Sequence, residues 1–198
     1  MFTGIIERLG KVTDIRQEGT NYHFTIESGI EDDIYIDQSI AHNGVCLTVV
    51  SIADGSYVVT AIKETMDKTN LGEVKIGDYI NLERAAISGS TRLDGHMVQG
   101  HVDGTTKCIH VEDADGSWYF TFQLDQDNAP LVVNKGSVCI SGVSLTVVEP
   151  TNDQFKVAII PYTYEHTTFK FLKAGDTVNL EYDIIGKYVQ RYMDNVRS

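Results

Sequence analysis

An internal duplication constrains the fold of this chain more than any other feature of its sequence. The segment NGVCLTVV (43–50) returns 98 residues later as SGVSLTVV (141–148). At the same separation, KTNLGEVKIGDYINLE (68–83) matches HTTFKFLKAGDTVNLE (166–181) at seven of sixteen positions. Two copies of this length are each large enough for a hydrophobic core, whereas a solenoid needs three or more shorter units. The repeat therefore predicts two tandem domains of similar fold.

The starts of the copies also correspond, because MFTGIIE (1–7) aligns with MVQGHVD (97–103) at a separation of 96. We therefore expect one domain over residues 1–96 and a second over 97–183.

Short segments rich in β-branched and aromatic residues predict strands in both copies. They are HFTIES (23–28), SYVVTAI (56–62), YINLERA (79–85), SWYFTFQL (117–124), FKVAII (155–160) and TVNLEYD (177–183). Asp-Gly pairs at 54–55 and 115–116 mark turns between them. About six short strands per copy, with room only for short helices at ETMDKTN and YEHTTFK, predict an all-β chain with a small closed barrel in each copy.

The last segment, 184–198, has a different pattern. Its apolar residues follow helical spacing: Ile185, Tyr188, Val189, Tyr192, Met193 and Val196. This predicts an amphipathic helix that is too short to be stable alone, so its apolar face needs a partner. Packing on its own barrel and self-association of chains both remain open.

Composition excludes several functions. The net charge is −12 and no cluster of Lys or Arg is present, which argues against nucleic acid as a partner. The three cysteines form no CxxC motif, which argues against a disulfide framework or a zinc site and fits a reducing compartment. The chain shows no signal-peptide pattern and no apolar run near the ~18 residues that span a bilayer, so we expect a cytoplasmic protein without membrane contact.

Cys46 and Ser144 occupy equivalent places in the repeat, where a thiol would face a hydroxyl if one site used both copies. The alternative is that a small residue is needed where a strand meets a turn. His42, His96 and His101 form no tight cluster in sequence, which argues against a metal site, and an acid–base or hydrogen-bonding role for one of them is favoured.

Two kinds of carboxylate stand out. Asp183 has no acidic counterpart in the first copy, where Ala85 stands, and this divergence is a hint of function. Glu83 and Glu181 are equivalent, and we expect them to be exposed or paired. Threonines that recur at strand ends suit hydrogen bonding to a neutral polar heterocycle, and the sequence has no GxxxxGK[ST], GxGxxG or GxSxG motif.

Over nearly its whole length the chain resembles the riboflavin synthase family, the lumazine-binding double-barrel proteins. The motifs that carry the resemblance are MFTGIIE, AHNGVCLTVV, GDYINLERA, GHMVQGHVDGT, SGVSLTVV, IIPYTYEHT and GDTVNLEYD. The resemblance implies two six-stranded Greek-key barrels and a C-terminal helix that assembles a homotrimer. It also implies an active site between the N-terminal barrel of one subunit and the C-terminal barrel of its neighbour.

The reaction that the resemblance implies is a dismutation. One molecule of 6,7-dimethyl-8-ribityllumazine gives a four-carbon unit to a second, and the products are riboflavin and 5-amino-6-(ribitylamino)uracil, without a cofactor. Two copies of one substrate held face to face explain two copies of one barrel. Lumazine synthase is a further partner that the family suggests.

The catalytic residues implied by the resemblance are Ser39, Cys46, His101, Ser144 and Asp183. The binding residues implied in the first barrel are Gly4, Ile5, Ile6, Cys46, Leu47, Thr48, Thr60, Ala61, Ile62, Lys63, Glu64 and Thr65. Those implied in the second barrel are Gly100, His101, Val102, Lys135, Ser144, Leu145, Thr146, Ile160, Pro161, Tyr162, Thr163, Tyr164 and Glu165.

The reaction needs one lumazine to lose a proton and the other to be attacked, so the two copies should differ at a few positions. Our hypothesis is that the second barrel activates its ligand, with Ser144 or water near C7 or a ring carbonyl. Tyr162 and Tyr164 can stack on the ligand ring or fill the mouth of the barrel.

Two other classes of function remain. One is a non-catalytic lumazine- or flavin-binding antenna protein, which would have lost signature residues in one barrel, whereas His101, Asp183 and both GV[CS]LTVV phrases are retained. The other is a structural double barrel without a ligand, against which the shared Thr and Gly pattern argues.

Overall fold

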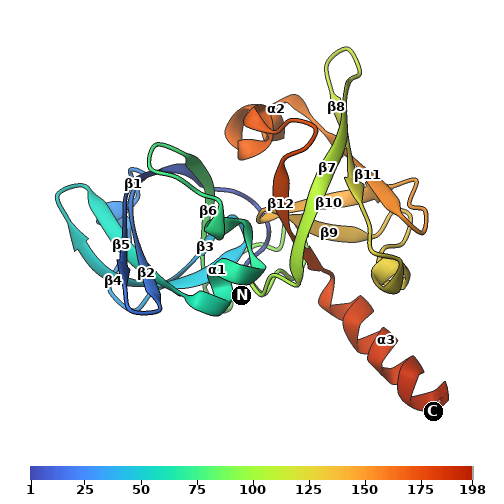
Figure 1. Ribbon diagram of the computed structural model, residues 1–198, viewed down its shortest axis with the longest axis horizontal. Helices are drawn as coiled ribbons and strands as arrows, with labels where there is room; N and C mark the ends of the chain where they lie inside the picture. The colour runs from blue at the N-terminus through green and yellow to red at the C-terminus, as the bar shows by residue number, and fades with distance from the viewer. Residues whose placement is uncertain (198) are drawn as a thin grey trace.

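The computed structural model describes residues 1–197 as two closed antiparallel barrels side by side and a helix that projects from the second barrel (Figure 1). The first barrel contains six strands: β1 (Arg8–Glu18), β2 (Asn21–Glu27), β3 (Ser39–His42), β4 (Val45–Ala53), β5 (Ser56–Ile62) and β6 (Tyr79–Arg84). Their order around the barrel is β1-β2-β5-β4-β3-β6, so β5 crosses to pair with β2 in a Greek-key arrangement.

The second barrel repeats this topology. Its strands are β7 (Gly104–Asp113), β8 (Trp118–Gln123), β9 (Ser137–Ile140), β10 (Val143–Val148), β11 (Gln154–Ile159) and β12 (Thr177–Tyr182). Read around the barrel, they follow the same cyclic order, β7-β8-β11-β10-β9-β12. The predicted fold, two six-stranded barrels followed by a helix, is confirmed.

Short helices connect the strands at equivalent places. α1 (Lys63–Lys68) and η2 (Asn70–Gly72) follow β5, and α2 (Pro161–His166) and η4 (Thr168–Phe171) follow β11, while η1 (Glu31–Asp33) and η3 (Gln126–Leu131) precede β3 and β9. Thr69 and Thr167 separate the two helices of each pair, since their hydroxyls donate to the carbonyls of Thr65 and Thr163 and accept from the next turn. The two short helices predicted from sequence are therefore present.

Period-two alternation fills each barrel with its own core. In β5, for example, Tyr57, Val59 and Ala61 point inward and are fully buried. Phe120, Phe122, Phe155 and Phe169 pack together inside the second barrel. The predicted Asp-Gly turns are found at the ends of two hairpins, with positive φ at both residues, as a tight hairpin turn requires.

The two barrels contact each other through a reciprocal set of amides. Asn81 and Asn179 are equivalent and buried; the side chain of Asn81 donates to the carbonyl of Ser141, and that of Asn179 donates to the carbonyl of Asn43, both at 2.8 Å. Close approach also needs glycine, because a Cβ on Gly44 would lie 2.8 Å from the backbone nitrogen of Gly142. The interface therefore has approximate two-fold symmetry.

The starts of the two copies lie between the barrels. Phe2 and Val98 form an antiparallel bridge, with N–H···O distances of 2.7 and 3.1 Å. The Gly4 carbonyl accepts from the N–H of Ser144 in β10, and the Gly100 carbonyl accepts from the N–H of Cys46 in β4. Each start therefore reaches the barrel of the other copy.

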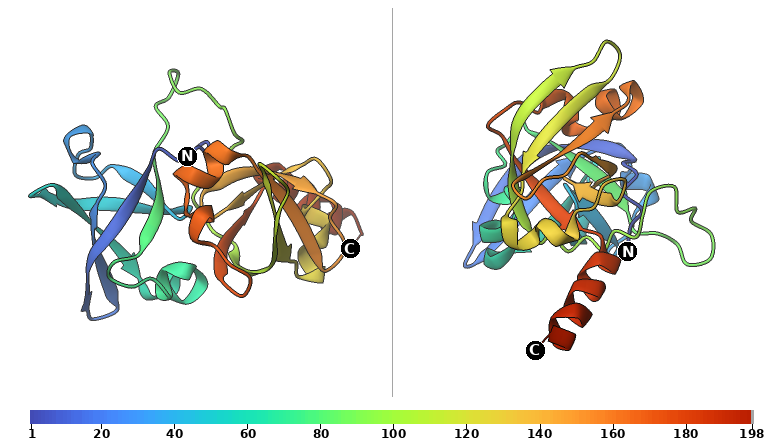
Figure 2. Two further views of the ribbon diagram at one scale, coloured as in Figure 1. Left: turned by 90° about the horizontal axis from the view of Figure 1, so that it is seen from above. Right: turned by 90° about the vertical axis from the view of Figure 1, so that its right-hand side faces the viewer.

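α3 (Ile184–Arg197) projects away from both barrels (Figures 1 and 2). Its apolar side chains are exposed, Tyr188 at 72% and Tyr192 at 68%, so the helix does not bury its apolar face on its own barrel. The predicted amphipathic helix is confirmed over residues 184–197, while Ser198 lies outside the described residues. None of the helices within residues 1–197 is long and apolar enough to span a membrane.

Candidate functional site

One pair of neighbouring strands separates in each barrel. β4 pairs with β5 only from Val49 onward, so Cys46, Leu47 and Thr48 pair with β3 alone. In the second barrel, β10 pairs with β11 only at Val147 and Val148. The separated strand edges leave backbone groups that can bond a flat heterocycle, in the way a sheet edge recognises an added strand.

The first site forms around the separated end of β4. Its predicted residues come from β4 (Cys46, Leu47, Thr48), the end of β5 (Thr60, Ala61, Ile62) and α1 (Lys63, Glu64, Thr65). Cys46 is half-buried and points outward, since its neighbours Val45 and Leu47 point into the core. Segment 100–102 lies beside it; a Cβ on Gly100 would be 2.7 Å from the Cβ of Cys46, and Val102 packs on the core of the first barrel.

The second site is the equivalent region of the second barrel. Its predicted residues come from β10 (Ser144, Leu145, Thr146), the residue before α2 (Ile160) and α2 itself (Pro161, Tyr162, Thr163, Tyr164, Glu165). Segment 4–6 lies beside them, because Gly4 bonds Ser144 and Ile6 packs on the core of the second barrel.

In this arrangement, two predicted segments bridge the barrels. We expect residues 4–6 to serve the first barrel and 100–102 the second. In the structure each segment contacts both barrels: its N–H groups bond a glutamate of its own barrel, while the carbonyls of Gly4 and Gly100 bond the other barrel. The physical reason is the bridge between Phe2 and Val98, which directs each start across the interface. His101 follows Gly100 on the segment that contacts Cys46.

His96 lies beside Ser144. Its Nδ1 is 2.6 Å from the Ser144 hydroxyl oxygen, and the side chain is buried. Burial lowers the pKa of the imidazole, and the negative charge of Asp183 opposes this shift. A neutral imidazole can accept the hydroxyl proton of Ser144 and thereby activate its oxygen.

His96 is absent from the predicted catalytic residues, although its motif GHMVQGH contains both histidines. The signal that could have favoured it is its place relative to the repeat. Met97 corresponds to Met1, so His96 has no counterpart in the first copy and is one of the differences between the copies.

The remaining predicted residues, Ser39, Lys135 and Asp183, lie in three separate places. Ser39 pairs with Thr48 across β3 and β4 and, with Ile5, lines a groove of about 840 Å³ under the linker 86–94. Lys135 is exposed at the far end of β10, where its N–H bonds the carbonyl of Val147. Asp183 accepts from the N–H of Ile185 at the start of α3.

The tyrosines of α2 have separate environments. Tyr164 stacks on Trp118 at 3.9 Å and packs on the core, so it fills the mouth of the second barrel. Tyr162 is 69% exposed and stacks on His166.

Glu83 and Glu181 differ from the expectation of exposed or paired side chains. Both are buried and accept hydrogen bonds from the starts of the copies, Glu83 from Thr3 and Gly4 and Glu181 from residues 99–101. Burial raises the pKa of each carboxyl, against the lowering effect of these hydrogen bonds.

Two of the three thiols are buried, which disfavours their thiolate forms. Burial raises the pKa of Cys108 to about 11 and that of Cys139 well above its usual value. Cys46 is the more accessible thiol. Within residues 1–197, no three His, Cys, Asp or Glu side chains gather in a group that could hold a metal ion.

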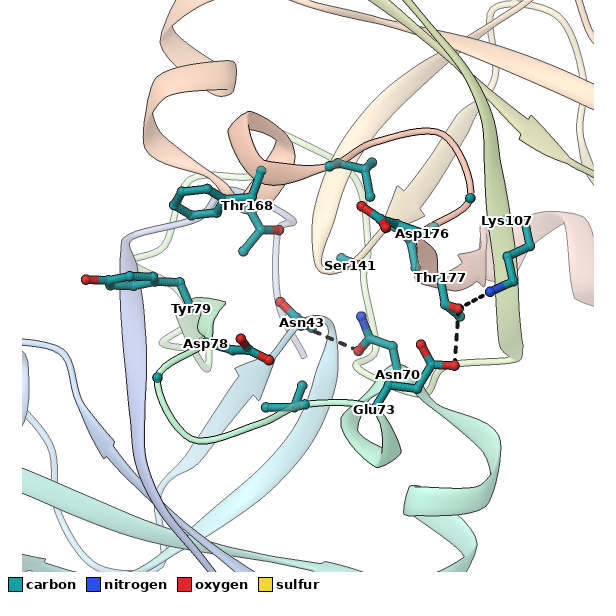
Figure 3. A pocket seen from close by; sticks show the side chains of 16 residues that line it. Asn43, Asn70, Glu73, Asp78, Tyr79, Lys107, Ser141, Thr168, Asp176 and Thr177 are labelled. Carbon is teal, nitrogen blue, oxygen red and sulfur yellow. Dashed lines mark hydrogen bonds between the residues drawn. The ribbon is translucent and has the colours of Figure 1, made fainter.

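A second groove, of about 550 Å³, lies between the barrels (Figure 3). Both copies contribute equivalent residues, such as Asn43 with Ser141 and Asn70 with Thr168. The predicted site residues do not line this groove, so it is separate from the two sites described above.

Comparison with known proteins agrees with this organisation. The family model described as "Lumazine binding domain" matches twice, over residues 3–85 and 99–183. Riboflavin synthases from Actinobacillus pleuropneumoniae and Bacillus subtilis are 39% and 38% identical to the chain, over 98% of it and 90% of each relative. The riboflavin synthase of Mycobacterium tuberculosis is 41% identical over 98% of both chains.

Among solved structures, the fold is similar to that of LumP complexed with riboflavin (TM-score 0.84, 21% identity) and with 6,7-dimethyl-8-(1'-D-ribityl) lumazine (TM-score 0.82, 20% identity). Each match covers 92% of this chain and 99% of LumP. Fold and repeat thus define a duplicated lumazine-binding protein. Within that class, the chain belongs to the riboflavin synthase family, whose members are enzymes.

Proposed function

We propose that this chain is the enzyme that converts two molecules of 6,7-dimethyl-8-ribityllumazine into riboflavin and 5-amino-6-(ribitylamino)uracil. The observation that carries the proposal is the pair of equivalent sites with unequal polar groups, Cys46 in the first and Ser144 with His96 in the second. Equivalent sites suit two copies of one substrate, and unequal groups suit the different roles of donor and acceptor. Holding the two molecules in a reactive orientation supplies much of the rate acceleration.

The second site activates its ligand through Ser144. Neutral His96 accepts the hydroxyl proton, and the negative Asp183 favours the imidazolium that results. The serine oxygen, or a water in its place, then acts at C7 or bonds a ring carbonyl of the lumazine. The separated edge of β10 and the residues before and within α2 hold the ring.

The first site holds the other lumazine against Cys46 and the separated edge of β4. Cys46 contacts the backbone of Gly100, and His101 follows on the same segment. In this arrangement the Cys46 thiol and the His101 imidazole polarise the lumazine bound in the first site, without a metal ion or a cofactor.

The complete active site forms between subunits of a homotrimer. The support for this part of the proposal is α3, whose exposed apolar face matches what a helix buried against copies of itself needs. Exposed apolar residues at the mouths of both sites, Ile62, Ile160 and Tyr162, also fit contact with a neighbouring subunit. Association with lumazine synthase and a cytoplasmic location stay predictions.

The test is to incubate the purified protein with 6,7-dimethyl-8-ribityllumazine, without metal or cofactor, and to follow riboflavin absorbance. Riboflavin formed at half the rate of lumazine consumption supports the dismutation. Lumazine that is bound but unchanged would instead indicate an antenna or carrier protein, and would remove the catalytic roles given to Ser144 and Cys46.

A further inference from the structure

The two buried glutamates hold the segments that complete the opposite sites. Glu181 lies in β12 of the second barrel, and its two carboxylate oxygens accept from the N–H groups of Gln99, Gly100 and His101 at 2.7, 3.0 and 2.9 Å. The next contact of this segment is with the first barrel, because the Gly100 carbonyl accepts from the N–H of Cys46 at 2.9 Å. A continuous chain of contacts therefore runs from Glu181 in one barrel to Cys46 in the other.

Glu83 makes the equivalent chain in the opposite direction. It lies in β6 of the first barrel and accepts from the N–H and hydroxyl of Thr3 at 2.6 and 2.7 Å and from the N–H of Gly4 at 2.9 Å. The Gly4 carbonyl accepts from the N–H of Ser144 at 2.8 Å. This chain joins Glu83 in the first barrel to the catalytic serine of the second.

Within residues 1–197, no ion pair explains the burial of these two carboxylates. Glu83 and Glu181 are 4% and 3% exposed, and within residues 1–197 neither forms an ion pair with a Lys, Arg or His side chain. Their hydrogen-bond partners are the backbone N–H groups of the two segments and the Thr3 hydroxyl. Burying a carboxylate is costly unless such donors compensate, and each donor is in turn fixed in direction by the carboxylate.

We infer that Glu83 and Glu181 are positioning residues that act crosswise: Glu181 shapes the first site, at Cys46, and Glu83 shapes the second site, at Ser144. This inference rests on the proposed function only for the identity of the ligand. Each barrel thereby completes the lumazine site of the other within one chain, so the two sites of a subunit are coupled through the interface between its barrels.

Glutamine is the informative substitution. It keeps the shape of glutamate but replaces one acceptor oxygen with an NH₂ group, which meets a backbone N–H as donor against donor. In Glu181→Gln the segment 99–101 loses part of its support, so Gly100 is released from Cys46. In Glu83→Gln the segment 3–4 is released from Ser144.

Alkylation of Cys46 reports on the first site, because Cys108 and Cys139 are buried and Cys46 is half-buried. Iodoacetamide labelling of the ligand-free full chain, followed by peptide mass spectrometry, measures its rate. We expect Glu181→Gln to change this rate about tenfold or more, the effect of losing one hydrogen bond to a charged group. Glu83→Gln is the matched control and should leave the rate within about twofold, because Ala41 separates Glu83 from Cys46 across β3.

The mirror experiment moves the reporter thiol to the second site with Cys46→Ser and Ser144→Cys in one chain. In that background, Glu83→Gln should change the labelling rate of the new thiol and Glu181→Gln should not. If each glutamine instead changes the thiol in its own barrel, or both thiols equally, the crosswise inference is wrong.

Two milder variants keep the test usable if a glutamine variant does not fold. Glu181→Asp keeps the charge but shortens the reach to residues 99–101, and Thr3→Val removes only the hydroxyl that bonds Glu83. Each should act on the same thiol as the corresponding glutamine variant, and an effect on the other thiol would overturn the inference.

Protection by added riboflavin separates this inference from the proposed function. Riboflavin that fails to slow Cys46 labelling in the unaltered chain would contradict the ligand assignment and leave the crosswise result standing. Riboflavin that protects, with no crosswise effect of the glutamine variants, would contradict the role of Glu83 and Glu181 alone.

Discussion

At the scale of single residues, the second candidate site differs from the first in the hydrogen bond between His96 and Ser144. Ser144 and His96 lie 2.6 Å apart, and Gly95 permits this approach because a Cβ there would lie 2.9 Å from the serine hydroxyl. Cys46 and Ser144 each have the backbone of a glycine beside them, Gly100 and Gly4 respectively. The two copies therefore differ both within the repeat, at Cys46 and Ser144, and through His96, which lies outside it.

Removing either member of the pair should slow the reaction. We expect Ser144→Ala and His96→Gln each to lower kcat by about 10²-fold, as for loss of a general base, and the double variant to be little worse because the two act as a unit. Riboflavin absorbance measures the rates. Unchanged activity of Ser144→Ala would remove the serine from the mechanism.

The same pair predicts a pH dependence. Only the neutral imidazole accepts the serine proton, and burial lowers the pKa of His96, so activity should be retained at neutral pH and fall as His96 is protonated on the acid side. In His96→Gln this acid limb of the kcat profile should disappear. A limb that persists unchanged would assign it to another group.

His42 should make the stability of the first barrel depend on pH. It is fully buried between the Ile40 carbonyl and the Tyr57 hydroxyl, and burial lowers its pKa from 6.5 to about 4. The unfolded chain takes up a proton at His42 as pH falls below 6.5 and the folded chain does not, so the stability contributed by the neutral form is lost from pH 6.5 down to about 4. We expect a loss of about 2 kcal/mol between pH 7 and pH 5.

Urea unfolding at the two pH values measures this loss. The control is His42→Asn, in which the overall stability changes but its dependence on pH over this window should become smaller. An equal dependence in the variant and the unaltered chain would show that other groups cause it.

At the scale of elements, α3 differs from every strand because, within residues 1–197, its apolar side chains are left exposed. Asp183 caps its first turn, and Lys187 pairs with Asp103 at 2.6 Å, so the chain fixes only the base of the helix. An exposed apolar stripe on a fixed base is suited to assembly.

If the chain forms the proposed trimer through α3, substituting Tyr188 and Tyr192 with serine should dissociate it without unfolding the barrels. Analytical ultracentrifugation should show monomers, and activity should fall with the loss of the shared site. Arg191→Gln, on the polar face, is the matched control and should remain trimeric. A doubly substituted protein that stays trimeric would place the assembly contact elsewhere.

At the scale of the whole molecule, the two barrels form one unit because the backbones of equivalent loops are in direct contact. Gly44 and Gly142 face each other with positive φ, and no side chain fits between them. The amides of Asn81 and Asn179 complete the contact by bonding the loops of the opposite copy. This close interface is what allows the crossing segments to reach the neighbouring site.

Gly142→Ala should separate the barrels. Its Cβ would lie 2.8 Å from the nitrogen of Gly44, whereas Gly175→Ala, also at positive φ, would meet open space. We expect Gly175→Ala to cost about 1–2 kcal/mol from backbone strain alone and Gly142→Ala to cost clearly more. Urea unfolding compares the two, and equal losses would mean that the interface adapts without cost.

The sequence by itself determined the two barrels, their turns and the amphipathic helix. These features follow from local patterns: a copy length of 98 residues, period-two alternation as in β5, Asp-Gly pairs with positive φ, and helical spacing from Ile185 to Val196. Burial of one face of an element needs only the residues of that element, so a linear pattern records it. The difference between Cys46 and Ser144 could also be predicted, because the two copies of the repeat can be aligned with each other.

Only the tertiary structure decided how the sites are completed. The bridging of the barrels by segments 4–6 and 100–102, the burial of Glu83 and Glu181 and the contact of His96 with Ser144 join residues 48 to 140 positions apart. No periodicity encodes such contacts, since they arise where two finished barrels meet and the bridge from Phe2 to Val98 directs the chain across the interface. A carboxylate that looks like a surface charge in the sequence is buried there because several backbone N–H groups converge on it.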